Sequence, residues 1–258
     1  MSGSEMARVV LIFLGVFIVL MGSARLPAVH KISDEWRRKM LHIAAGILAM
    51  GLPAVFARTA PVIVLCVAVL VALIAMRFSK RRIYDADRFS LGELCIPIAA
   101  AFLFVASAGD ALNYNVPLAI LTFADSTAAI AGQRCPAGRI RILGQKTLAG
   151  SVAFFAIAFL VTLGGVAFFA GVSLGTALAL PMALIVAFDL TVVELVCRYG
   201  LDNLLVPLAG FFLLNTLRHA DAVEMAAHLA LAAIAAALLA VHMSVRMAAG
   251  HAQKGRAQ

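Results

Sequence analysis

Residues 147–188 read TLAGSVAFFAIAFLVTLGGVAFFAGVSLGTALALPMALIVAF, a run of 42 residues without Asp, Glu, Lys or Arg. A bilayer core about 30 Å thick is crossed by about 20 helical residues, so the run is too long for one transmembrane helix and long enough for two. Gly164-Gly165, Gly171, Gly175 and Pro181 interrupt it. Glycine and proline punctuate helices, so we expect the chain to turn among them. The run predicts a pair of membrane-spanning helices.

The remainder of the 258-residue chain has the same character. Hydrophobic residues make up 64% of it, charged residues make up 13%, and the mean hydropathy is +1.02. A soluble protein of this size would lack the polar side chains to cover its surface. An outer-membrane barrel would show alternating strands with aromatic girdles, whereas this chain has only 3 Tyr and 1 Trp. The composition predicts an all-α, polytopic helical membrane protein in which residues 1–258 form one membrane domain.

Other charge-free runs have lengths close to that of a membrane span, and Ala111–Gln133 is a further stretch interrupted only by Asp125. With the pair in 147–188 they predict nine transmembrane helices. A count of seven or eight is the alternative, because Leu204–Leu217 has only 14 residues. The charge-free runs are Val9–Ala24, Met40–Ala57, Thr59–Met76, Leu94–Gly109, Leu204–Leu217 and Met225–Val245.

The basic residues predict the orientation of the chain. The net charge is +8 and the pI is about 9.9, but Lys and Arg fall between the apolar runs, which argues against nucleic acid as a partner. With the N-terminus outside and the C-terminus inside, 18 of the 21 basic residues would be cytoplasmic, and only Arg8, Arg58 and Arg218 would not. Positive charge favours the cytoplasmic side. We therefore expect an integral membrane protein, in the inner (plasma) membrane if it is bacterial.

Asp125 lies within an apolar stretch, where a carboxylate is costly unless it faces a partner, a cation or water. Thr122, Asp125, Ala129 and Gly132 follow the spacing of one helical face. Their small side chains would let a helix or a ligand approach the carboxylate. A functional site is the first interpretation, and a carboxylate paired to a neighbouring helix for packing is the alternative.

The segment from Gly132 to Ser151 mixes four glycines with Arg134, Arg139, Arg141 and Lys146. Glycines let backbone N–H groups approach a phosphate while cations neutralise its oxygens, so the composition suits a polyphosphate. It is not a Walker P-loop, because Gln145 stands where that motif requires glycine before the lysine. An ordinary basic loop is the alternative interpretation.

Glu194, Asp202 and Asn203 supply oxygen atoms near the predicted end of the seventh span. Mg²⁺ is commonly held by one or two carboxylates, with water and substrate phosphates at its other positions. The alternatives are a helix stop at Asp202-Asn203 and an ion pair between Glu194 and Arg198.

A fourth polar cluster, Arg37-Arg38-Lys39 with His42, opens the second predicted span. Arg38 and His42 lie four residues apart and share a face, so the pair could reach a phosphate at the membrane surface. Membrane anchors and a structural histidine are the alternatives. The nine-span arrangement puts all four clusters at or near the cytoplasmic side.

These motifs, in this order, resemble the polytopic CTP-dependent lipid-alcohol kinases, which include phytol, dolichol and diacylglycerol kinases. The resemblance covers about residues 35–215. Ala149 stands where the dolichol branch has Glu, which makes the chain more similar to the phytol kinase branch. The motifs are Arg38-Lys39-x-x-His42, Asp125-x-x-Ala128 with Gly132, Lys146-Thr147-x-Ala149-Gly150-Ser151, and Val193-Glu194 with Asp202-Asn203 and Val206-Pro207-Leu208.

The resemblance implies transfer of the γ-phosphoryl group of CTP to a lipid alcohol of the phytol, polyprenol or diacylglycerol type, at the cytoplasmic face and with Mg²⁺ as cofactor. Asp125, Glu194 and Asp202 would bind the metal and, with Lys146, form the catalytic set, while Arg38, Lys39 and His42 would contact phosphate or the head group. The nucleotide-binding residues would be Gly132, Arg139, Arg141, Lys146, Thr147, Gly150, Ser151 and Asn203.

Two other classes of membrane protein have similar sequence features. A phosphatidate cytidylyltransferase also takes CTP and Mg²⁺ but releases pyrophosphate and forms a CDP-lipid. A transporter would use Asp125 as an ion or proton site and would show symmetry between two halves of the chain. The sequence leaves the identity of the alcohol and the oligomeric state open.

Overall fold

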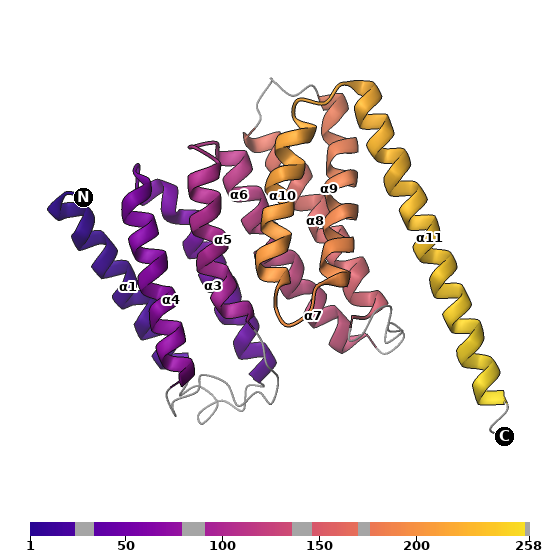
Figure 1. Cartoon of the computed structure of the whole chain (residues 1–258), viewed down its shortest axis with the longest axis horizontal. Helices are drawn as coiled ribbons and strands as arrows, with labels where there is room; N and C mark the ends of the chain where they lie inside the picture. Colours follow the sequence, from indigo (N-terminus) through magenta and orange to yellow (C-terminus); the bar gives the residue numbers. More distant parts are fainter. Residues whose placement is uncertain (24–33, 79–90, 136–145, 170–175, 256–258) are drawn as a thin grey trace.

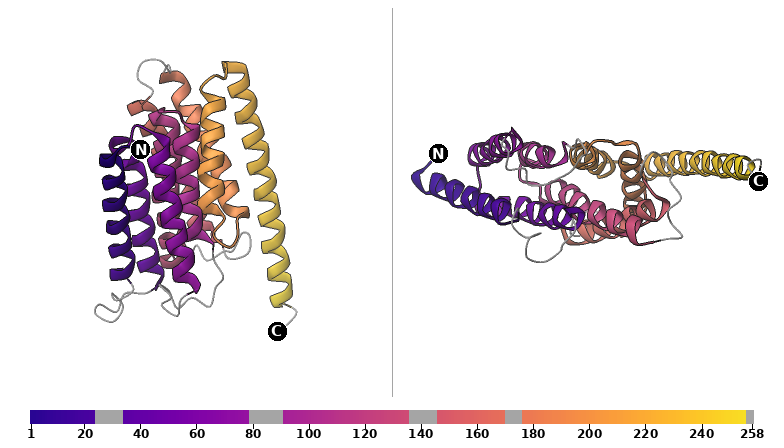
Figure 2. Two further views of the ribbon diagram at one scale, coloured as in Figure 1. Left: turned by 60° about the vertical axis from the view of Figure 1, so that its left-hand side comes forward. Right: turned by 90° about the horizontal axis from the view of Figure 1, so that it is seen from below.

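The computed structural model describes residues 1–23, 34–78, 91–135, 146–169 and 176–255, and every regular element within them is helical. The helices stand side by side in an elongated array that runs from α1 to α11 (Figures 1 and 2). The all-α prediction is confirmed for these residues. The elements are α1 (Gly3–Ser23), α3 (Asp34–Val55), α4 (Thr59–Phe78), α5 (Gly92–Ala106), α6 (Ala111–Ala119), the π-helix η1 (Ile120–Ala124), α7 (Asp125–Arg134), α8 (Leu148–Phe169), α9 (Thr176–Val196), α10 (Asp202–Leu217) and α11 (Ala222–Gly255).

Five of these helices, α1, α3, α4, α8 and α9, are long and apolar enough to cross a membrane. The 42-residue run is divided between α8 and α9, as its length predicted. Helices α5 and α10 and the first part of α11 are apolar but shorter, so the count of nine spans stays a prediction. Large apolar side chains such as Leu11, Ile18, Leu231 and Leu238 are exposed on the two outermost helices, α1 and α11, which suits a lipid environment.

The apolar interior consists of two clusters that meet at α6. Leu112 and Val116 belong to a cluster shared with α8, α9 and α10, while Tyr114 and Leu118 belong to a second cluster shared with α1, α3, α4 and α5. Residues four apart lie on one face of a helix, so α6 turns one face to each cluster. A Cβ atom on Gly165 of α8 would lie 2.2 Å from a methyl group of Val116, so only glycine allows this approach of α8 to α6.

Helices α6 and α7 form one continuous rod interrupted by η1. Asp110 begins the rod by accepting hydrogen bonds from the backbone N–H groups of Leu112 (2.9 Å) and Asn113 (3.1 Å). Pro117 lacks an N–H group and disturbs the regular hydrogen-bond ladder. Three residues later the helix widens into the π-turn Ile120–Ala124, and Asp125 is the first residue beyond it. Short π-segments are frequent at functional sites.

The helices alternate in direction, so that α3 begins, α7 ends, α8 begins, α9 ends and α10 begins at the same end of the array (Figure 1). At the opposite end Arg218 pairs with Asp110, and Arg8 donates a hydrogen bond to the carbonyl of Val55 (3.0 Å). The predicted outside residues Arg8 and Arg218 thus share one end. Which end faces the cytoplasm stays a prediction from the basic-residue bias.

Candidate functional site

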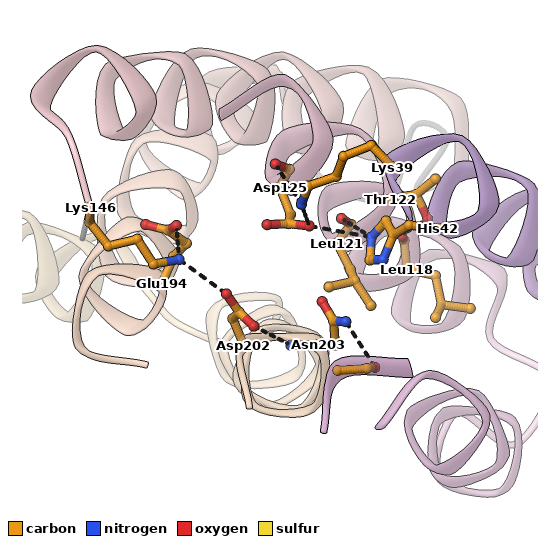
Figure 3. A network of polar contacts seen from close by, with 11 residues as sticks. Lys39, His42, Leu118, Leu121, Thr122, Asp125, Lys146, Glu194, Asp202 and Asn203 are labelled. Carbon is orange, nitrogen blue, oxygen red and sulfur yellow. Dashed lines mark hydrogen bonds and ion pairs between the residues drawn. The ribbon is translucent and has the colours of Figure 1, made fainter. Parts of the chain in front are cut away.

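Three carboxylates from three helices meet near the end of the array where α3 begins. Asp125 begins α7, Glu194 lies in the last turn of α9, and Asp202 begins α10. One carboxylate oxygen from each lies within 4.8 Å of the others (Figure 3). The residues that the sequence analysis proposed as metal ligands are therefore neighbours in space, although about eighty positions of sequence separate the outermost two.

Asp202 is positioned by the turn between α9 and α10. Tyr199 (φ 59°) and Gly200 (φ 82°) both adopt the left-handed backbone conformation there. The carbonyl of Tyr199 accepts a hydrogen bond from the backbone N–H of Leu91 (2.7 Å), and the Asn203 side-chain amide donates to the carbonyl of Gly92 (2.9 Å). These two bonds fasten the turn to the start of α5, so Asp202 does not depend on a free loop for its place.

Lys146, which precedes α8, is the cation on one side of the carboxylates. Its ammonium group donates a short hydrogen bond to Glu194 Oε1 and a 3.0 Å bond to Asp202 Oδ2. Burial by itself would lower the pKa of Lys146, but the carboxylates of Glu194 and Asp202 outweigh it and raise that pKa above its usual value. Lys146 is therefore positively charged at neutral pH and joins the ends of α9 and α10.

Lys39 and His42 of α3 lie on the other side, against Asp125. The Lys39 ammonium is 2.5 Å from Asp125 Oδ2 and 3.5 Å from the Asp125 backbone carbonyl. The His42 ring nitrogen Nε2 donates to the carbonyl of Leu121 (3.0 Å) and lies 3.6 Å from Asp125 Oδ2. Figure 3 shows the second Asp125 oxygen turned toward the group formed by Lys146, Glu194 and Asp202.

The three carboxylates are the groups of the site that could hold a metal ion. The carboxylates of Asp125, Glu194 and Asp202 outnumber the ammonium groups of Lys39 and Lys146 by one, and Glu194 Oε2 is buried without a hydrogen-bond partner. Two oxygens on one Mg²⁺ lie at most about 4.2 Å apart, since each Mg–O distance is about 2.0–2.1 Å. The carboxylate oxygens of the site lie up to 4.8 Å apart, and small side-chain movements would bring them within the shorter distance. Asp125, Glu194 and Asp202 are therefore the residues that could hold a divalent cation.

The glycines and hydroxyls assigned to the nucleotide serve the packing of α7 against α8. A Cβ atom on Gly132 would lie 2.7 Å from Thr147 Oγ1, and one on Gly150 would lie 3.0 Å from the carbonyl of Ala128. The Thr147 hydroxyl accepts a bond from the backbone N–H of Gly150 (3.2 Å), and the Ser151 hydroxyl donates to the Thr147 carbonyl (3.2 Å). These contacts hold the start of α8, and with it Lys146, beside Asp125.

The other predicted site residues do not all contact the three carboxylates. Arg139 and Arg141 lie outside the described residues. Arg38 is exposed, whereas its neighbour Lys39 is buried, and Lys39 and His42 are the α3 residues that lie against Asp125. The contact of Arg38 with a phosphate stays a prediction. Asn203 is buried, and its side-chain amide donates a hydrogen bond to the carbonyl of Gly92 at the start of α5.

Three sequence interpretations are corrected. Asp202 and Asn203 begin α10 and do not stop a helix, and Glu194 takes Lys146 as its ion-pair partner in place of Arg198. The face shared by Thr122, Asp125, Ala129 and Gly132 does not exist as one surface. Thr122 lies inside the π-turn Ile120–Ala124 and Asp125 follows it, which changes the helical register between them; beyond the turn Gly132 faces the start of α8, while Ala129 lies near Trp36 and Lys39 of α3.

Sequence reasoning missed Ser126 and Trp36. The Ser126 hydroxyl is buried without a hydrogen-bond partner, next to Asp125. The Trp36 ring lies 5.1 Å from the Arg134 guanidinium carbon, across the end of the α3–α7 pair. A hydroxyl beside a carboxylate in an apolar stretch was a signal for Ser126, but nothing local in sequence relates Trp36 to Arg134.

No family model, curated protein or solved structure matches this chain.

Proposed function

We propose that the protein transfers the γ-phosphoryl group of CTP to the hydroxyl group of a membrane lipid alcohol at the cytoplasmic face. The observation that carries this proposal is the convergence of three carboxylates and two lysines at one end of an array of apolar helices. Phosphoryl transfer depends on neutralised phosphate oxygens, a metal ion and a positioned acceptor. The resemblance of the motifs to lipid-alcohol kinases supports the same reaction.

The residues divide into two groups with different tasks. Glu194 and Asp202 would hold Mg²⁺ directly, and Asp125 would hold it directly or through water. When bound, the ion would neutralise charge on the phosphate oxygens. Lys146 lies beside Glu194 and Asp202 and is the cation placed to contact the transferred phosphate. Lys39 and His42 fix one oxygen of Asp125, which leaves the other to orient the alcohol.

In the proposed reaction the alcohol oxygen forms a bond to the γ phosphorus as the bond from that phosphorus to the oxygen bridging it to the β phosphorus breaks. CDP leaves with the bridging oxygen. Asp125 accepts the hydroxyl proton and passes it to solvent. The products are a lipid monophosphate and CDP, and the charge in the transition state is stabilised by groups that are already in place.

The decisive experiment identifies the products. Purified protein given CTP, Mg²⁺ and a mixture of phytol, polyprenol and diacylglycerol is expected to yield CDP and a lipid monophosphate. Pyrophosphate together with a CDP-lipid from added phosphatidate would establish the cytidylyltransferase instead. An absence of nucleotide turnover with any lipid would favour transport. For the Asp125→Asn variant described in the Discussion, Asp221→Asn is the matched control, because Asp221 caps the start of α11 at the opposite end of the array and Asn caps a helix equally well.

A further inference from the structure

The two lysines that neutralise the three clustered carboxylates differ in how firmly they are held. Lys39 belongs to α3, its side chain is 6% exposed, and its ammonium group lies 2.5 Å from Asp125 Oδ2. Lys146 lies outside the helices, just before α8 begins at Leu148, and its side chain is 27% exposed. A lysine stem is flexible, and its ammonium group is a compact charge with rotatable donors. Lys146 is therefore the cation that can leave the site without movement of a helix.

Lys146 lies between two of these carboxylates. Its ammonium group donates to Glu194 Oε1 and, at 3.0 Å, to Asp202 Oδ2 (Figure 3). An ammonium nitrogen lies about 2.7–2.9 Å from a carboxylate oxygen, whereas Mg²⁺ lies about 2.0–2.1 Å from its oxygen ligands, so the two cations compete for one pair of oxygens. Glu194 Oε2 is buried and has no hydrogen-bond partner. Buried polar atoms are normally paired, so this oxygen is a second indication of a further cation.

The formal charges of the site favour exchange of one cation for the other before a nucleotide binds. At about pH 8 an ordinary histidine is neutral, so the three carboxylates and the two lysines leave one negative charge. A divalent cation added to both lysines would leave one positive charge, whereas a divalent cation in place of Lys146 leaves none. Buried charges destabilise a protein unless they are compensated. Replacement of Lys146 is therefore the least costly way to admit the ion.

We infer that Lys146 is an exchangeable cation, which a divalent metal ion displaces from Glu194 and Asp202. The inference rests on the proposed function, which assigns a metal ion to these carboxylates. Lys39 stays on one oxygen of Asp125, since the other oxygen is turned toward the group formed by Lys146, Glu194 and Asp202 (Figure 3). The displaced ammonium group becomes free for the phosphate contact that the proposed function gives it. The metal ion therefore binds before Lys146 reaches a phosphate.

Acetylation of lysines in the purified protein, in detergent without nucleotide or lipid, tests the exchange. Only an unprotonated amine reacts; burial lowers the pKa of Lys146, but Glu194 and Asp202 outweigh burial and raise it, so the paired lysine is protected. Saturating Mg²⁺ should increase acetylation of Lys146 several-fold, because loss of both carboxylate contacts lowers that pKa. Lys39 is the internal control and should stay protected with and without Mg²⁺. Unchanged labelling of Lys146 while metal binds would overturn the inference.

Titration with Mn²⁺, followed by the electron paramagnetic resonance of the free ion, measures the competition. Lys146→Met should raise the affinity for Mn²⁺ roughly tenfold or more. Lys146→Arg should lower it, because a guanidinium group binds carboxylates more firmly than an ammonium group does. A lysine that only repels the ion from a distance predicts no change in Lys146→Arg. Arg134→Met is the matched control: it removes an exposed cation from the same end of the array and should change the affinity about twofold or less.

These measurements separate the inference from the proposed reaction. Equal Mn²⁺ affinity in Lys146→Met, Lys146→Arg and the unsubstituted protein would overturn the exchange, even if the protein forms CDP and a lipid monophosphate. Exchange without phosphoryl transfer to any lipid would retain the inference and reject the kinase. Absence of Mn²⁺ binding would overturn both the inference and the metal assignment. The acetylation experiment uses the unsubstituted protein, so it decides the question even where a variant of Lys146 does not fold.

Discussion

Lys146 is the residue on which the charge balance of the site depends. Its ammonium group lies between Glu194 and Asp202, two carboxylates that are largely hidden from water. Buried charges destabilise a protein unless they are paired, and a divalent cation can provide the same compensation as an ammonium group. A metal ion held by Glu194 and Asp202, as proposed, would share their charge with Lys146, so each cation would reduce the cost of removing the other.

Lys146→Met is expected to lower phosphoryl transfer about a hundred- to a thousandfold, the usual result of removing one preorganised charge contact to a transition state. It should also leave Glu194 and Asp202 without their counter-ion, so Mg²⁺ should raise the thermal unfolding midpoint more in the variant than in the unsubstituted protein. Thermal unfolding in detergent across a Mg²⁺ titration measures this. Equal Mg²⁺ responses in both proteins would contradict a metal site at these carboxylates.

Asp125→Asn and Lys39→Met test the buried ion pair between Lys39 and Asp125. Removing one partner of a buried pair destabilises a protein by about 3–5 kcal/mol, because the other charge remains buried and uncompensated. The double variant should be more stable than the sum of the single effects predicts, yet it should remain inactive because Asp125 is still missing. Denaturant unfolding and turnover per folded molecule separate the two effects. Normal turnover in the folded double variant would exclude Asp125 from the chemistry.

At the scale of elements, the fit of α3 against η1 determines where Lys39 meets Asp125. A Cβ atom on Gly46 would lie 1.9 Å from the Thr122 hydroxyl oxygen, and Thr122 is fully buried, with its hydroxyl bound to the Leu118 carbonyl (2.6 Å). The π-turn thus touches α3 at a point where no side chain fits. One turn nearer the end of the array, His42 and Lys39 contact Leu121 and Asp125.

Gly46→Ala is expected to push α3 away from η1, lower the unfolding midpoint and reduce turnover by separating Lys39 from Asp125. Gly51→Ala on the same helix is the matched control, since a Cβ atom there meets nothing within 4 Å. In an exposed helix interior, replacing Gly by Ala stabilises by roughly 0.5–1 kcal/mol. The two substitutions should therefore act in opposite directions in a thermal unfolding assay. Similar behaviour of both variants would show that the close contact at Gly46 is not needed.

At the scale of the whole molecule, the site depends on alternating helix directions. They bring the starts of α3, α8 and α10 and the ends of α7 and α9 together. The same alternation puts Arg8 and Arg218 at the far end, in agreement with the separation that the basic residues predicted. The membrane would lie between these two ends, and the basic-residue bias predicts that the end with the site faces the cytoplasm.

Cys135 offers a native test of this orientation. It is exposed at the end of α7, whereas Cys66, Cys95 and Cys197 are buried. Burial, together with the nearby Asp202 carboxylate, raises the pKa of the Cys197 thiol to about 11, so that thiol stays protonated and unreactive at about pH 8. An impermeant maleimide should modify Cys135 only after cells are permeabilised. Modification in intact cells, with Cys135→Ser as the control, would reverse the predicted sidedness.

The sequence by itself determined the kind of molecule and the kinds of groups that form its site. Hydropathy and charge-free length are properties of a local stretch, and so they predicted apolar helices and the division of residues 147–188 between two of them. Asp125, Lys146, Glu194 and Asp202 were identifiable because charged groups in or beside apolar segments are costly without a specific partner.

Only the tertiary structure decided which of these groups touch. The choice of Lys39 over Arg38 depends on the rotation of α3 about its axis, which the close contact of Gly46 with Thr122 fixes. The pairing of Lys146 with Glu194 and Asp202 depends on how α8, α9 and α10 pack, through contacts between residues far apart in the chain. Helix rotation and packing are set by side chains from several segments at once, and no local pattern in the sequence contains that information.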